Sequence, residues 1–356
     1  MSVQSGAFEL GMFEEFWRRK GQTETGAFRD AFAQIDAGER YGLDVAWLAE
    51  LHVNPDRSVL SAPLNIASAI AARTKRLKIG IAVQVLPLCH PLRLAEEVAT
   101  VDHISDGRLI FGVGRSGFAR TYDAYGIPYA ESRERFAEVL EIIEKAFREE
   151  RFSYKGRYHS FDNVCLVPKP VQKPCPEIRM AATSYDTYPV IGGQGYPILI
   201  AVRQGKIEEL APHLTAYRAA YKGAGHKGEP RVYLRVPVYV GETPAAARAE
   251  PEHSIMPFYR ELGAQIAKTV AAGGVTAGEN RSAKAEALMH VSYEETLAQK
   301  VIVGSPDEVA ARINELKSAL GINGILAEMN CGGLIPHERV MSSIRLLCEK
   351  VRPRVR

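Results

Sequence analysis

The fold is decided by one stretch of the sequence, Lys78-Ile-Gly-Ile-Ala-Val-Gln-Val-Leu86, together with residues 92–104 and Leu109-Ile-Phe-Gly-Val113 that follow it. The first and last segments are continuous apolar runs, which are typical of parallel strands covered on both faces. The middle segment follows a break at His90-Pro91 and carries its acidic residues on one side, which predicts a helix. Strand, helix and strand in this order predict a parallel βαβ unit.

The same alternation continues in both directions from this unit. It predicts a (β/α)8 TIM barrel, because eight strands alternate with helices and a last helix follows the last strand. A doubly wound open sheet is the alternative. We expect strands at 8–13, 44–50, 78–86, 109–113, 178–182, 198–202, 233–240 and 325–329, and helices at 28–41, 60–73, 92–104, 131–150, 186–194, 207–223, 307–320 and 336–351.

The chain has 356 residues, whereas a typical barrel has about 250. Two regions account for the surplus. Residues 151–176 are rich in proline and are expected to be irregular. Residues 251–300, between strands seven and eight, contain Gly273-Gly274 and many charges, and are expected to form a mobile insertion over the active site. We therefore expect one domain over residues 1–356.

Composition excludes several classes of protein. Apolar residues make up 46% of the chain, and 45 basic against 42 acidic residues give a net charge of +3. This charge is too weak a field for a nucleic-acid binder. Apolar runs are too short to span a membrane and no secretory signal is visible, so a cytoplasmic protein is expected. The five cysteines lack CxxC spacing, which disfavours a disulfide framework or a metal site.

Two motifs favour a phosphate site at the mouth of the barrel. Residues 112–117 fit the pattern GxGxxG, but a dinucleotide site needs a helix that starts within the motif. Aromatic residues, glycine and proline in Phe118–Pro128 argue against an immediate helix, so we interpret the motif as a glycine-rich loop with Arg115 available for a phosphate. Ala182-Thr183-Ser184 precedes a predicted helix, where a phosphate site and an ordinary N-cap both remain possible.

Three titratable residues follow adjacent strands. Glu50 and His52 end the second predicted strand, and His90 follows the third. A single histidine is more often structural than catalytic, but three such groups at one edge are candidates for proton transfer. The sequence contains neither a HExxH metal motif nor a GxSxG nucleophile motif.

Several segments of the sequence together resemble the bacterial luciferase-like, flavin-dependent monooxygenase family. The resemblance covers nearly the whole chain in order. It rests on Asp44–His52, Leu86–Val98, Val101–Arg115, Gly156–Tyr158 with Pro168–Pro170, Ala181–Ser184, Gly304–Val309 and Gly321–Gly324.

This resemblance implies a chemistry and its partners. A separate NAD(P)H:flavin reductase would supply reduced FMN, O2 would form a C4a-peroxyflavin, and the protein would be a homodimer. A non-prolyl cis peptide is implied near Ala82-Val83, beneath the flavin ring. The other cofactor-binding residues implied are Gly114, Arg115, Ala182, Thr183, Ser184 and Thr187.

One departure from the family bears on catalysis. Members close to luciferase carry Glu-His-His where this chain has Glu50-Leu51-His52. Leucine cannot transfer a proton, so we expect monooxygenation without light emission, with His52, Glu50 and His90 as candidate catalytic residues. Side chains near strand ends predict a small apolar or aromatic organic substrate, although they also fit ordinary packing at the rim: Phe13, Trp17, Leu51, Phe118, Tyr122 and Tyr125.

Two other functions remain open. A deazaflavin-dependent hydride-transfer oxidoreductase would share the barrel and would not use O2. A non-catalytic flavin-binding protein is the second alternative, but such proteins are shortened barrels. Because this chain is predicted to keep all eight strands and the long insertion, an enzyme is favoured.

Overall fold

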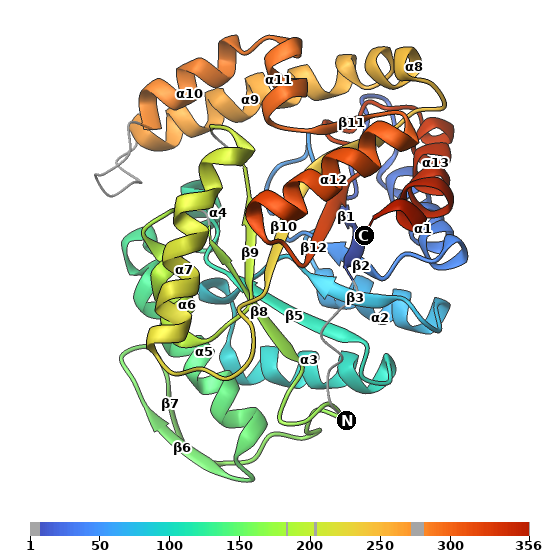
Figure 1. Cartoon of the computed structure of the whole chain (residues 1–356). Coiled ribbons are helices and arrows are strands. Elements are labelled where there is room, and N and C mark those ends of the chain that lie inside the picture. Colours follow the sequence, from blue (N-terminus) through green and yellow to red (C-terminus); the bar gives the residue numbers. More distant parts are fainter. Residues whose placement is uncertain (1–7, 183, 203–204, 272–280, 356) are drawn as a thin grey trace.

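The computed structural model describes residues 8–182, 184–202, 205–271 and 281–355. Its centre is a closed ring of parallel strands in which each strand pairs with the next and β10 pairs with both β9 and β12 (Figure 1). The predicted eight-stranded barrel is therefore confirmed, and the open sheet is wrong. The barrel strands are β1 (Glu9–Glu14), β2 (Val45–Leu48), β3 (Lys78–Ile81), β5 (Leu109–Gly114), β8 (Glu177–Ala182), β9 (Ile198–Ala201), β10 (Val232–Val240) and β12 (Gly324–Glu328).

Helices surround this ring. Local sequence sets several of their ends: proline occupies the first turn of α2, α3 and α12, and Gly42 and Gly321 end α1 and α12 in the left-handed conformation. The main helices are α1 (Glu24–Tyr41), α2 (Pro63–Arg73), α3 (Pro91–Ile104), α5 (Ser132–Arg148), α6 (Thr187–Gln194), α7 (Ala211–Gly223), α12 (Pro306–Leu320) and α13 (His337–Leu346). Shorter elements are η1 (Leu86–Leu88), α4 (Ala119–Ala124), η2 (Tyr129–Glu131), η3 (Ile207–Leu210), α8 (Pro244–Ala249), the π-turn η4 (Leu347–Val351) and η5 (Arg352–Arg354).

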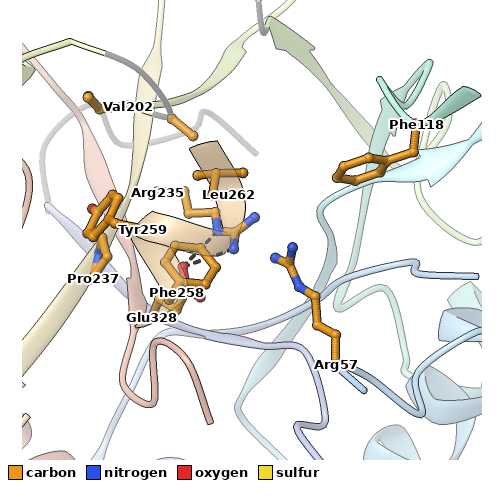
Figure 2. Close-up of a pocket in the computed structure, with 10 residues that line it drawn as sticks. Arg57, Phe118, Val202, Arg235, Pro237, Phe258, Tyr259, Leu262 and Glu328 are labelled. Carbon is orange, nitrogen blue, oxygen red and sulfur yellow. Dashed lines mark hydrogen bonds and ion pairs between the residues drawn. The ribbon is translucent and has the colours of Figure 1, made fainter. Parts of the chain in front are cut away.

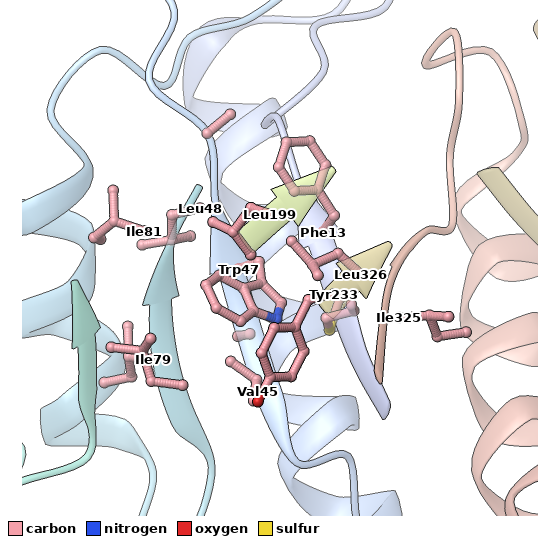
Figure 3. Packing of buried hydrophobic residues seen from close by; sticks show 14 of the residues in the cluster. Phe13, Val45, Trp47, Leu48, Ile79, Ile81, Leu199, Tyr233, Ile325 and Leu326 are labelled. Carbon is pink, nitrogen blue, oxygen red and sulfur yellow. The ribbon is translucent and has the colours of Figure 1, made fainter. Parts of the chain in front are cut away.

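Trp47 is completely buried in the interior of the barrel, among other apolar side chains (Figure 3). A Cβ atom on Gly80 of the neighbouring strand would lie 2.2 Å from the Trp47 ring, so this position requires glycine. The Arg179 guanidinium lies 5.0 Å from the Trp47 ring centre and is held by Glu9 and Glu177 at 2.7 to 2.9 Å. Arg179 and Trp47 therefore occupy space inside the barrel. Ligands of TIM barrels bind at the carboxyl ends of the strands.

The third strand is shorter than expected. The single strand predicted at 78–86 ends at Ile81, and its continuation is the short β4 (Gln84–Val85), which pairs with β5. Between them the Ala82-Val83 peptide bond is cis, as the resemblance implied.

Two regions contain regular structure that the sequence did not predict. Residues 151–176, expected to be irregular, include an antiparallel hairpin of β6 (Phe152–Lys155) and β7 (Ser160–Val164). Its side chains are largely exposed, so it lacks the apolar pattern of a buried strand. The helix α4 follows the glycine motif directly, although the residues after Gly117 argued against it.

The predicted insertion at 251–300 is mainly helical. It comprises α9 (Glu252–Ala271), α10 (Arg281–His290) and α11 (Tyr293–Gln299), and residues 272–280 lie outside the described part. The helices share a small apolar cluster that includes Ile255, Leu262 and Leu288, and they lie along one end of the barrel (Figure 1). The following strand β11 (Ile302–Gly304) pairs with β10. Mobility of this region stays a prediction.

The described helices include none that is both long and apolar enough to cross a membrane.

Candidate active site at the barrel mouth

A pocket lies at the carboxyl ends of the strands (Figure 2). Active sites of TIM barrels lie at this end. The loops after β2 and β5, the ends of β9 and β12, the middle of β10 and the helix α9 all contribute to it. The lining residues are Arg57, Phe118, Ala201, Val202, Arg235, Pro237, Phe258, Tyr259, Leu262 and Glu328.

A buried ionic network forms one wall of this pocket. Arg57 donates two hydrogen bonds of 2.7 Å to the two carboxylate oxygens of Glu15. Arg235 donates to Glu15 at 2.7 Å and to Glu328 at 2.9 Å. Sequence reasoning missed all four residues. The available signal was acidic residues at the ends of apolar runs, at Glu14-Glu15 and at Glu328.

The carboxyl groups of this network differ in their electrostatic environment. Burial would raise the pKa of Glu15, but Arg57 and Arg235 outweigh it and lower the pKa to about 2. Burial, together with the charges of Glu328 and Glu15, raises the pKa of Glu14 to about 8. Burial also raises the pKa of Glu328, whose Oε1 is buried and lacks a hydrogen-bond partner. The mouth thus combines Glu15, which is held as a carboxylate, with Glu14, which retains a proton near neutral pH, and with Glu328, whose pKa burial shifts upward.

The predicted pair Glu50 and His52 is brought together in the loop after β2. His52 Nε2 lies 2.8 Å from Glu50 Oε1, and its Nδ1 lies 3.1 Å from the Tyr125 hydroxyl. The second oxygen of Glu50 accepts a hydrogen bond of 2.7 Å from the backbone N–H of Val85, just beyond the cis peptide. Burial raises the pKa of Glu50, although its hydrogen bonds oppose this shift. The arrangement can hold or pass a proton along Tyr125, His52 and Glu50.

The third predicted catalytic residue, His90, lies elsewhere. It is exposed, precedes α3 and packs against the β6–β7 hairpin, with ring centres 5.7 Å from His159 and 5.8 Å from Phe161. The structure therefore brings Glu50 and His52 into direct contact and places His90 in a different cluster.

Arg115 occupies the loop after β5. Its Nη1 donates to the Ser132 hydroxyl at 2.9 Å, its guanidinium lies 5.8 Å from the Tyr129 ring centre, and its carbonyl accepts a hydrogen bond from Tyr122. Within the described residues no carboxylate pairs with Arg115. A partly buried cation with neutral neighbours is suited to an anionic ligand.

An ion pair links the loop after β8 to the start of α5, where Ser132 binds Arg115. Arg133, the residue after Ser132, lies 3.7 Å from Asp186, which directly precedes α6. Ala182 is the buried last residue of β8, whereas Thr183 lies outside the described residues. The Thr187 hydroxyl donates to the Ser184 carbonyl at 2.6 Å. Cofactor contacts of Ser184 and Thr187 stay predictions.

The glycines of the GxGxxG motif are explained by packing. A Cβ on Gly112 would lie 1.9 Å from the Ile81 carbonyl oxygen, and one on Gly114 would lie 2.4 Å from Val83. The two glycines allow β5 to approach the third strand and the cis peptide. This packing requirement supports the interpretation that the motif is not a dinucleotide fingerprint.

The six predicted substrate-binding residues lie in different parts of the barrel mouth. Phe118 lines the pocket, and Trp17 meets the lining residue Phe258 edge to face at 6.1 Å. Phe13 is buried beneath the Arg235 guanidinium at 3.8 Å. Leu51 and Tyr125 accompany the Glu50–His52 pair, where Tyr125 is 48% exposed. Tyr122 is completely buried, and its bond to Arg115 favours a supporting role over a substrate contact.

A family model for luciferase-like monooxygenases matches residues 8–323. The chain belongs to the luciferase-like monooxygenase family. It is 25% identical over 363 residues to limonene 1,2-monooxygenase of Rhodococcus erythropolis, covering 99% of this chain and 88% of that protein. It is 27% identical over 319 residues to an FMNH2-dependent dimethylsulfone monooxygenase of Pseudomonas putida, covering 85% and 79%.

The fold agrees with solved structures of similar proteins. The oxygenating constituent of 3,6-diketocamphane monooxygenase of Pseudomonas putida, in complex with FMN, superposes with a TM-score of 0.81 at 22% identity, over 98% of this chain and 99% of that one. At this identity the likeness shows the fold alone.

One relative of this chain is named for a different cofactor and activity. The chain is 30% identical over 165 residues to an F420-dependent glucose-6-phosphate dehydrogenase of Kineococcus radiotolerans, covering 44% of this chain and 48% of that protein. It also spans only about half the length, 54% and 50%, of two uncharacterized proteins of Sinorhizobium fredii that it matches. Family membership thus leaves the cofactor open between FMN and F420.

Proposed function

We propose that this enzyme is the oxygenase component of a two-component monooxygenase, which uses reduced FMN and O2 to oxidise a small organic substrate with an apolar or aromatic body. The observation that carries the proposal is Arg115: a partly buried guanidinium at the barrel mouth whose neighbours, Ser132 and Tyr129, are neutral. This cation fits the phosphate of FMN.

The surroundings of Arg115 fit the rest of the cofactor. The loop that carries Ser184 and Thr187 lies next to it through the Arg133–Asp186 pair, so their hydroxyls and backbone groups would face the same phosphate. From there the flavin ring would extend toward Ala82-Val83, where Glu50 fixes the chain by binding the Val85 N–H. Gly114 and Ala182 lie at the ends of the strands that flank this path.

Reduced FMN, when bound, would react with O2 and supply the oxidising group. The chain itself would orient the substrate and control protons and water. His52, held between Glu50 and Tyr125, would exchange a proton with the reacting centre. Leu262 and Phe258 of α9 would exclude water from the pocket.

The proposal includes an NAD(P)H:flavin reductase as a separate protein. The glycine motif that resembles a dinucleotide site is explained by the packing of β5. One relative is named as FMNH2-dependent and another as the oxygenase component of a flavin-dependent trigonelline monooxygenase. A homodimer is part of the same proposal, by resemblance to the family.

Anaerobic titration with reduced FMN and with reduced F420, followed by addition of O2, tests this function. We expect reduced FMN to bind and O2 to be consumed with it. Preferential binding of reduced F420, with no oxygen consumption, would instead identify a hydride-transfer oxidoreductase. Flavin binding without O2 use or product formation across a substrate panel would indicate a binding protein.

A further inference from the structure

Arg57 and Arg235 both line the pocket, and each has an N–H group that its ion pairs do not use. Arg57 uses Nε and Nη2 to bind Glu15, and Arg235 uses Nε and Nη2 to bind Glu328 and Glu15. Among the described residues, neither Nη1 group donates a hydrogen bond. Figure 2 shows the two guanidinium groups pointing toward one another across the pocket that both residues line.

A third polar atom lies at the same wall. Glu328 lines the pocket, and its Oε1 is buried with no hydrogen-bond partner, while Oε2 binds Arg235. Buried polar atoms are nearly always paired, so this oxygen can accept a hydrogen bond from water or from a donor group of a ligand. The remaining walls are mostly apolar and include Phe118, Val202 and Leu262.

The charge of the wall favours an anion. Two guanidinium groups share Glu15, whose pKa they hold at about 2, so this carboxylate neutralises only one of them. Glu328 accepts hydrogen bonds from Arg235, while burial raises its pKa. A carboxylate from a ligand would balance the second cation and would match the planar fork of each guanidinium.

We propose that this pocket selects an organic acid: an apolar body packs against Phe118 and Leu262, and its carboxylate binds the Nη1 groups of Arg57 and Arg235. The inference rests on the proposed function, because it takes this pocket as the substrate site of the oxygenase. It narrows the substrate class from any small apolar molecule to one that carries a single negative group.

Tryptophan fluorescence can report binding at this wall. The Arg57 guanidinium lies 5.2 Å from the centre of the Trp17 ring, and the other tryptophan, Trp47, is buried inside the barrel. We would titrate the protein, with and without FMN, with phenylacetate and cyclohexylacetate and with the methyl ester of each. The acids are expected to bind about 10- to 100-fold more tightly than their esters, as for a charge-assisted hydrogen bond.

Three variants separate recognition from stability. Arg57→Met keeps roughly the side-chain volume and is expected to reduce the preference for acid over ester, because one of the two arginine contacts is lost. The double variant Arg57→Met/Glu15→Gln removes both charges of the pair, so it is expected to fold and to show the same loss. Arg345→Met, on the outer helix α13 where it pairs with Glu242, is the control and is expected to keep the preference.

The outcomes distinguish this inference from the proposed function. Equal affinity for acid and ester in the wild-type protein, or no quenching by either acid up to about 10 mM, overturns the organic-acid site while flavin binding remains. A preference that is as large in both Arg57 variants as in the wild-type protein also overturns it. If the protein binds the acids but does not bind flavin, the oxygenase function is contradicted and the organic-acid site is not.

Discussion

At the scale of single residues, environment decides what each carboxyl group of the mouth can do. Glu14 and Glu15 are neighbours in sequence, yet the pKa of Glu14 is about 8 and that of Glu15 is about 2. Two arginines stabilise the charge of Glu15, whereas Glu14 is buried near other acids. No property of the Glu-Glu dipeptide itself predicts this difference.

Glu14 makes the stability of the protein depend on pH. Its folded-state pKa lies above the usual value, so the folded state keeps a proton that the unfolded chain releases. This contribution is present in full below about pH 4.5 and is lost as the pH rises toward 8. We expect the unfolding free energy to fall with pH in this window, with a slope that approaches about 1.4 kcal/mol per pH unit.

Urea unfolding of Glu14→Gln at several pH values tests this dependence. The variant cannot titrate at this position, so its slope between pH 5 and 8 is expected to be smaller than in the wild-type protein. Glu24→Gln, an exposed position, is the control and should keep the wild-type slope. Parallel curves for Glu14→Gln and wild type would contradict the assignment.

Arg115 is the residue on which the flavin proposal depends. Arg115→Ala is expected to weaken binding of reduced FMN by roughly 2 kcal/mol, because one charge-assisted contact to the phosphate is lost. Anaerobic titration measures the change. Riboflavin, which lacks the phosphate, should bind both proteins equally, and Arg93→Ala on the surface of α3 should leave FMN affinity unchanged. Unchanged FMN affinity in Arg115→Ala would contradict the assignment of Arg115 to the phosphate.

At the scale of elements, the helix α9 is the part of the insertion that lines the pocket. It contributes Phe258, Tyr259 and Leu262 to the pocket, and it packs with α10 through the small apolar cluster of the insertion. Its place in the chain, between strands seven and eight, was predicted from excess length. Its helical structure and the side chains that it places over the pocket came only from the fold.

Leu262→Ala is expected to admit water to the pocket. In the proposed reaction, more of the O2 consumed should then be released as hydrogen peroxide instead of oxidising substrate. The ratio of peroxide to product, measured with a fixed supply of reduced FMN, reports this leak. Leu297→Ala, in α11 at the edge of the same apolar cluster and not in the pocket lining, is the matched control. An unchanged ratio of peroxide to product in Leu262→Ala would argue against a role of α9 in excluding water from the pocket.

At the scale of the whole molecule, side chains from several strands pack together inside the barrel. Trp47 occupies space that Gly80 leaves open, and Arg179 lies over its ring with Glu9 and Glu177 as partners. Strands distant in sequence thus meet at one centre.

Gly80→Ala tests this packing. A Cβ would enter the Trp47 ring, so we expect a loss of about 3 kcal/mol in unfolding free energy. Gly193→Ala in α6 is the opposite case, because a Cβ there meets nothing within 4 Å, and alanine favours a helix by about 1 kcal/mol. Thermal unfolding compares the two. Equal stability of Gly80→Ala and wild type would show that the interior adapts without cost.

The sequence by itself determined the barrel, the order of its strands and the position of the insertion, because apolar periodicity and chain punctuation are local properties. It also brought Glu50 and His52 together, since residues two apart at one strand end remain neighbours. It missed the β6–β7 hairpin, whose exposed strands bury little. Only the tertiary structure assembled Glu15, Arg57, Arg235 and Glu328, and only burial among those partners set their charges. Contacts between distant strands, and the pKa shifts that burial causes, depend on which strands become neighbours, and acidic residues at the ends of apolar runs do not specify their partners.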